Sequence, residues 1–376
     1  GAVDPDPSDK AEITVSKPKL PDGFMLYQYQ KYTVKVNVKA TGLTEDITVS
    51  GFTNAKPAVT TIAAADACSP AGYDLELTLD ASAGSEIAET LSFTSGETKS
   101  TLAVNADVLP ASTLMNFRFV PTMTEWATYY FSGNATVTHV DAASGKIYLQ
   151  DVVGGMALGY KEMTGLTESP FKVGDKVTGL YILATEPSFG VPGCELLAHY
   201  PADGVGFGIV ADSGQTKDPI ELSAAELNEN LETYLNRLVK ISDVSFSAAG
   251  DKFSTTGTAV TSGGSTVKVR AFAGTNISGT EIPAQAAAVV GISTSPTTAM
   301  ITMRSLADLI AAPAGEETLE VSEELLVSAT EYYPINVATP FAKFTVKAQN
   351  LSRPAAIYVT GANRDQFTAD LEEIPA

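Results

Sequence analysis

Apolar and polar residues alternate one by one over much of the segment from Ile13 to Val108. Because successive side chains of a β-strand point to opposite faces, this period predicts strands with one face on a core and the other in water. Turn residues such as Pro21-Asp22-Gly23 and Ser95-Gly96 separate the alternating series, which predicts an Ig-like β-sandwich over residues 11–108. The clearest series are Val34, Val36 and Val38, and Leu75, Leu77 and Leu79.

The chain has 376 residues, enough for three or four domains of roughly 100 to 150 residues each. Hydrophobic residues make up 44% of it and charged residues only 18%, which favours packed cores. We predict an all-β, multidomain protein. The predicted units are a tether over 1–10, the sandwich over 11–108, a connector over 109–125, two β-rich units over 126–201 and 202–314, and a partial Ig-like β-sandwich over 315–376.

The charge of the chain restricts its partners. With 44 acidic and 24 basic residues, the net charge is -20, which repels the phosphates of nucleic acids and anionic membrane surfaces. No apolar run approaches the roughly 20 residues that span a bilayer. Cys68 and Cys194 fall in different predicted units, so we predict no disulfide within a unit.

The first central unit is predicted from a strand over 128–140, a turn at Asp141 to Gly145, and further strand segments over 146–160 and 171–183, completed by 190–200. The hydrophobic connector before it, with Phe117 and Phe119, is expected to pack at a domain junction.

The second central unit begins with a segment whose apolar spacing fits one short helix over 222–235. Ser223 is the expected N-cap, and Glu226 is its capping-box partner. The apolar residues of this helix are Leu222, Ala225, Leu227, Leu231 and Leu235. Strands are predicted after it at RLVKISDVSF, TVKVRAF, AAAVVGIS and MITMRS.

A short internal repeat links the two ends of the chain. Residues 38–44 correspond to 346–352, residues 47–51 to 357–361, and the upstream ITVSKPKL to LEVSEELL. The repeat predicts that the segment from Glu317 is the front part of a second sandwich, which an additional segment or another chain completes.

The strings IYLQDVVGGMALGY and FKVGDKVTGLYIL resemble the OB-fold-like domains of exported Bacteroidetes proteins, and LNRLVKISDVSF, EIPAQAAAVVGIS and ITMRSLADLI resemble the companion form. The resemblance covers about 128–310 and implies two OB-fold-like β-barrels, flanked by Ig-like spacers as in surface lipoproteins. With the Pro/Asp-rich start AVDPDPSDK, it implies a secreted protein or an outer-membrane lipoprotein whose lipid anchor precedes Gly1.

Catalytic and metal-binding patterns are weak. His139 with Asp141, and His199, lack metal-motif spacing, so ordinary strand histidines are favoured over a metal site. No nucleophile motif and no cofactor motif occurs. Gly154-Gly155 is predicted to be a hairpin turn, and 262–265 a flexible connection, rather than phosphate loops.

The remaining candidate is an aromatic cluster in the first central unit, where exposed rings could stack on sugars or bases. Four basic and seven acidic residues between Trp126 and Tyr200 give a net charge of -3, which favours an uncharged glycan over a nucleic acid. Tyr129 and the adjacent Tyr130 must point to opposite sides of the strand. Packing in the core is the alternative role for these rings. The candidate ligand-binding residues are Trp126, Tyr129, Tyr148, Tyr160, Tyr181 and Phe189.

Three functions remain open from the sequence. The first is a non-enzymatic surface or secreted protein that binds a glycan or a surface protein without a cofactor. The second is a structural or adhesive assembly component whose last sandwich is completed by a partner's strand. The third is an accessory region of an exported nuclease or hydrolase.

Overall fold

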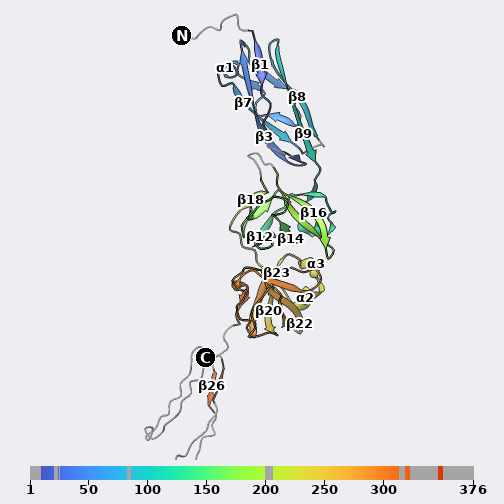
Figure 1. Ribbon diagram of the computed structural model, residues 1–376, viewed down its shortest axis with the longest axis vertical. Coiled ribbons are helices and arrows are strands. Elements are labelled where there is room, and N and C mark those ends of the chain that lie inside the picture. The colour runs from blue at the N-terminus through green and yellow to red at the C-terminus, as the bar shows by residue number, and fades with distance from the viewer. Residues whose placement is uncertain are drawn as a thin grey trace, which may run out of the picture.

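The computed structural model is an all-β protein of several units, as predicted, and three of these units follow one another along its long axis (Figure 1). Within the part of the chain that it describes, no helix is long and apolar enough to cross a membrane. The described residues are 10–20, 24, 26–82, 86–199, 206–312, 318–321 and 346–349. The predicted tether over 1–10 therefore lies almost wholly outside them.

The N-terminal unit is a sandwich of two sheets around one core. The two predicted alternating series lie on β3 and β7, and their valines and leucines are at most 4% exposed, which confirms the period-two prediction. One sheet has the order β1 (Glu12–Val15), β3 (Lys31–Thr41), β7 (Tyr73–Asp80) and β5 (Ala55–Pro57). The other has the order β2 (Leu26–Tyr27), β9 (Thr98–Leu109), β8 (Glu86–Ser95), β4 (Ile47–Ser50) and β6 (Thr61–Ile62), and α1 (Ala64–Ala67) follows β6.

The first central unit is a curled nine-stranded sheet in the order β10-β11-β16-β17-β14-β13-β12-β15-β18. β15 pairs with β12, whereas β16 pairs with β17, so the kink at Gly179 carries the chain from one part of the sheet to the other. Its strands are β10 (Ser112–Leu114), β11 (Thr128–Phe131), β12 (Ala135–Asp141), β13 (Lys146–Gln150), β14 (Gly155–Gly159), β15 (Lys176–Thr178), β16 (Leu180–Ser188), β17 (Val191–Leu197) and β18 (Ile209–Asp212).

Three sequence expectations for this unit need correction. The single strand predicted over 128–140 is two strands, because the chain turns at Gly133, where a Cβ atom would collide with the carbonyl oxygen of Met115. The connector packs at a domain junction as expected, through Leu109 and Ala111, but it is not a separate unit, because it contributes β10 to the sheet and its 3-10 helix η1 (Phe117–Thr122) adds Phe117 and Val120 to the core. β18 pairs with β15, so the first sheet extends beyond the predicted boundary at residue 201.

The second central unit is a closed five-stranded barrel in which β20 pairs with both β21 and β23. β14 and β17 of the first unit form a parallel pair, and so do β22 and β24 at the corresponding positions of the second unit, so this part of the connectivity is shared. Its elements are β19 (Ile220–Leu222), α2 (Ala224–Glu229), α3 (Leu231–Tyr234), β20 (Leu238–Phe246), β21 (Thr258–Ser262), β22 (Ser265–Ala271), β23 (Gln285–Ser293), β24 (Met300–Met303), η2 (Leu306–Asp308) and β25 (Leu309–Ile310).

The predicted helix is correct at its start and wrong in its length. Ser223 accepts a hydrogen bond from the Glu226 amide at 3.1 Å, as expected of the N-cap. The helix then breaks at Asn230, whose backbone is not helical and whose side chain donates to the Glu226 carbonyl. Leu222 lies in β19, and Ala224 rather than Ala225 faces the core.

The segment 262–265 is a tight turn rather than a flexible connection. Ser262 pairs directly with Ser265 across β21 and β22. Gly263 and Gly264 both have positive φ angles, 55° and 81°, as a two-residue type I′ hairpin requires.

The internal repeat is confirmed at the level of strand pairing. β26 (Thr318–Val321) pairs with β27 (Val346–Gln349) in the register in which β1 pairs with β3. The aligned repeats therefore match position by position, although residues 357–361, the second part of the repeat, lie outside the described residues. The equivalent pairs are Ile13 with Ala40 and Leu319 with Ala348, then Val15 with Val38 and Val321 with Val346.

Packed aromatic rings join the sandwich to the first central unit. The rings of Tyr27 and Tyr181 stack with centroids 5.0 Å apart, and the Tyr181 hydroxyl donates to the Gln28 carbonyl at 2.8 Å. Tyr29 stacks on Tyr130 in the same place, at 5.5 Å.

A second packed junction joins the two central units. Phe272 lies 4.2 Å from the His139 ring and 5.3 Å from the Tyr148 ring, measured between centroids. The side-chain oxygen of the buried Gln150 accepts a hydrogen bond from the Leu238 amide, the first of β20, at 2.8 Å. Neither junction is a free linker.

Candidate functional site

Three of the six aromatic candidates are not surface residues. Tyr148 is 7% exposed and packs against Phe272 of the second unit, and Tyr160 lies in the core of the first unit. Tyr181 is 1% exposed at the junction with the sandwich. The predicted aromatic face therefore does not form, because neighbouring units and the core cover these rings.

The other three rings are accessible to different degrees. Trp126 is 66% exposed and Phe189 is 80% exposed, whereas Tyr129 is half-buried with its hydroxyl accepting from the Thr124 amide at 2.7 Å. As expected, Tyr130 faces the opposite way from Tyr129, toward the junction with the sandwich. Of the candidates, only Phe189 lines a pocket described below.

The two histidines lie at the two junctions rather than in a metal site. Among the described residues, no group of three or more His, Cys, Asp or Glu side chains is placed to hold a metal ion. Burial lowers the pKa of His139 and of His199 to about 4, so both are neutral at physiological pH. Cys68 and Cys194 are both free thiols.

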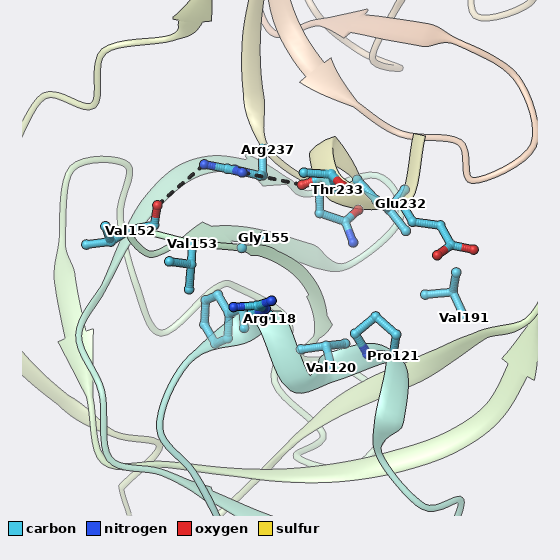
Figure 2. Close-up of a pocket in the computed structure, with 14 residues that line it drawn as sticks. Arg118, Val120, Pro121, Val152, Val153, Gly155, Val191, Glu232, Thr233 and Arg237 are labelled. Carbon is cyan, nitrogen blue, oxygen red and sulfur yellow. Dashed lines mark hydrogen bonds between the residues drawn. The ribbon is translucent and has the colours of Figure 1, made fainter. Parts of the chain in front are cut away.

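A cavity of about 540 Å³ lies where the two central units meet. An adjoining pocket of about 410 Å³ shares four of its residues, and we call the two together the junction groove. Figure 2 shows the first pocket, with η1 on one side and the turn between α3 and β20 on the other. The shared residues are Val120, Val191, Leu235 and Asn236.

One wall of the groove is the tip of the β13–β14 hairpin, which Asp151 holds in place. Its carboxylate accepts from the amides of Val153 and Gly154, each at 2.7 Å, and from the Phe117 amide of η1 at 2.6 Å. Because all three donors are backbone groups, this carboxylate fixes the hairpin tip relative to the connector.

Gly154 and Gly155 allow three segments to meet at this point. A Cβ atom on Gly154 would collide with the backbone of Phe117, and one on Gly155 with the backbone of Asn236. The prediction of a hairpin turn is confirmed, but the sequence did not reveal that the two glycines let the connector and the second unit approach the hairpin.

The opposite wall carries Arg237, whose hydrogen bonds are long and whose guanidinium lies over the Tyr234 ring, 5.8 Å from the ring centroid. Its two terminal nitrogens donate to the carbonyls of Thr233 at 3.4 Å and Val152 at 3.5 Å (Figure 2). Its buried Nε atom has no partner, and burial lowers the pKa of this guanidinium. The preceding Asn236 has a φ of 60°, a left-handed conformation that asparagine adopts more readily than most residues.

The residues that line the groove have a positive net charge, whereas the chain as a whole has a negative one. The second pocket also holds Glu195, whose pKa is raised by burial and by nearby Glu162. Four cations and two carboxylates line the groove in a protein with a net charge of -20, so its local field favours anions. The cations are Arg118, Lys146, Arg237 and Arg270, and the carboxylates are Glu195 and Glu232.

Phe189 is exposed on a turn whose backbone conformation lowers the stability of the folded chain. It is the first residue of the two-residue turn between β16 and β17, with a φ of 52°, where asparagine or glycine is preferred. We expect Phe189→Asn to raise the free energy of unfolding by about 1 kcal/mol, measured by chemical denaturation. A lower stability for the variant would contradict this, and it would indicate that the ring packs favourably against the groove.

The site that the structure offers is thus a groove between two units rather than an aromatic face, and of the six ligand-binding candidates from the sequence only Phe189 lines it. Comparison with protein-family models, with curated proteins and with solved structures finds no match to this chain.

Proposed function

We propose that this chain is a non-enzymatic binding protein, secreted or held on the cell surface, and that the junction groove binds a carbohydrate. The observation that carries the proposal is a groove whose walls are fixed in advance by Asp151, by the two glycines and by the packed junction. Pre-formed pockets of roughly 300 to 1,000 Å³ are typical of small-ligand sites. The first pocket of the groove, with about 540 Å³, lies in this range.

The lining suits a sugar chain. Apolar side chains alternate with polar ones, as the apolar faces and hydroxyl edges of sugar rings require, and the exposed ring of Phe189 provides a stacking surface at the rim. The apolar residues that form the first pocket include Val120, Val153, Val191 and Leu235.

The resemblance of both central units to OB-fold-like domains of exported Bacteroidetes proteins supports a surface or secreted location. The shared connectivity of the two units is consistent with two copies of one binding fold.

Val152→Trp tests the location of the site. Val152 is 83% exposed at the hairpin tip, so the variant is expected to fold normally. The larger tryptophan ring should then obstruct the groove. We expect binding on a glycan array to fall by about tenfold or more for this variant, because a 1.4 kcal/mol loss already gives that factor.

Val173→Trp is the matched control. Val173 is 57% exposed in another turn of the same unit and lines neither pocket of the groove. An equal loss of binding in both variants would exclude the groove as the site, and no glycan binding by the wild-type chain would reject the proposed function.

A further inference from the structure

Two arginines face the first pocket of the groove from opposite walls. Figure 2 shows Arg118 on η1 and Arg237 at the start of β20, with Gly155 between them. Neither guanidinium forms a salt bridge within the described residues. Arg237 is half-buried, where an unpaired guanidinium is costly, and Arg118 is exposed, so each arginine retains its capacity to bind an anion.

The nearby carboxylates form no ion pair with these arginines within the described residues, although the charge of Asp151 acts on Arg237 and raises its pKa against the effect of burial. The Asp151 carboxylate accepts hydrogen bonds from three backbone amides, which hold it in the hairpin tip. Glu232 is exposed at the rim on the far side of the pocket from Val152 (Figure 2). The Nε atom of Arg237 is buried without a partner, so the hydrogen-bonding capacity of this guanidinium is only partly used within the described residues.

A second cationic position lies in the adjoining pocket. Arg270 donates from Nε to the Thr302 hydroxyl at 2.9 Å and from a terminal nitrogen to the Thr294 hydroxyl at 3.2 Å. Both partners are neutral hydroxyls, so the charge of Arg270 is positioned without being neutralised by them, and Lys146 lines the same pocket. The groove therefore has cations in both of its connected parts.

We infer that the groove binds an anionic saccharide, with an acidic group of one sugar unit between Arg118 and Arg237 and the next acidic unit near Arg270. This inference rests on the proposed function, and it replaces the uncharged glycan that the net charge of the first unit favours. A guanidinium matches planar carboxylates in two parallel hydrogen bonds, and it also binds sulfate esters.

A saccharide fits this site better than an acidic peptide. The first pocket is formed mainly by the hairpin tip, η1 and α3, which offer turns rather than a strand edge to which a peptide could add. The exposed Phe189 ring in the second pocket adds a stacking surface for a sugar.

The test is affinity gel electrophoresis of the full chain with a panel of polymers. The panel contains three polyuronates (polygalacturonate, alginate and hyaluronan), their carboxyl-reduced neutral forms, dextran sulfate and polyglutamate. We expect at least one polyuronate to retard the protein and its reduced form not to do so. Retardation by dextran sulfate would also support an anionic sugar, provided that it depends on the arginines.

Arg118→Gln and Arg237→Gln are each expected to weaken retardation by about tenfold to a hundredfold, as for the loss of a charge-assisted hydrogen bond. Lys99→Gln is the matched control, because Lys99 is an exposed cation on β9 of the sandwich, and it should bind as the wild type does. Arg118 is itself exposed, so its variant also controls for misfolding.

The other outcomes separate this inference from the proposed function. Equal binding of acidic and reduced polymers, or retardation that the arginine variants do not change, would overturn the anionic inference while glycan binding stands. Retardation by polyglutamate alone would overturn it in favour of a peptide. If no polymer in the panel binds but the array finds a neutral glycan, the inference fails alone, and if neither binds, both fail.

Discussion

Tyr148→Ala is expected to lower the free energy of unfolding of the central units by about 3 to 5 kcal/mol, the usual loss for removing a large buried ring. Tyr148 is 7% exposed, and its ring packs edge-on against Phe272 of the second central unit. The substitution therefore opens a cavity at the junction. Chemical denaturation followed by near-ultraviolet circular dichroism measures the loss.

Trp126→Ala is the matched control for this experiment. Trp126 is also an aromatic candidate from the sequence, but it is 66% exposed, so its removal should change the free energy of unfolding by less than about 1 kcal/mol. If Tyr148→Ala were as mild as Trp126→Ala, the ring at 148 could not be a buried part of the junction.

Acidification from pH 7 to pH 4 is expected to destabilise the chain by roughly 2 to 3 kcal/mol for each histidine. Burial lowers the pKa of His139 and of His199 from 6.5 to about 4 in the folded state. Both histidines bind protons more readily when the chain unfolds, so their contribution is complete above pH 6.5 and is lost as the pH falls toward 4.

The charges around the histidines are few. Asp141 and Asp308 raise the pKa of His139 and Arg304 lowers it, but each does so less than burial does. Tyr181 packs against His199, with ring centroids 5.1 Å apart, and burial is the only cause of the lowered pKa there. Protonation at either site therefore places a charge in a packed junction.

The variants His139→Gln and His199→Gln isolate these contributions. Each is expected to flatten the decline of the free energy of unfolding between pH 6.5 and pH 4, measured by urea denaturation at several pH values. Burial raises the pKa of Glu195, so its contribution to the free energy of unfolding increases as the pH falls, opposite to that of the histidines. The quantity to compare is therefore the difference in the free energy of unfolding between variant and wild type at each pH. An unchanged slope in both variants would show that the histidines are accessible.

The strands could be predicted from the sequence because their signals are local. The alternation on β3 and β7 depends only on neighbouring residues, and so does the cap of α2 by Ser223. The residue correspondence of the repeat between the chain ends also agrees with the register of β26 and β27. The break in the helix at Asn230 was missed, because the apolar spacing continued through it.

The candidate site could not be predicted in the same way. The burial of Tyr148 depends on Phe272, and that of Tyr181 depends on Tyr27, and in each case the two residues belong to different units. The groove likewise brings Arg118 from the connector beside a turn of the second unit. The adjacent glycines at 154 and 155 were the one available signal of a close backbone approach.

The packed junctions have a mechanical consequence. Tyr181 is hydrogen-bonded to Gln28, and Gln150 is hydrogen-bonded to the first amide of β20. The sandwich and the two central units should therefore behave as one stiff rod rather than as units that move independently. Under a pulling force, the chain is expected to lengthen by breaking these contacts and unravelling strands, with little slack taken up beforehand by hinges.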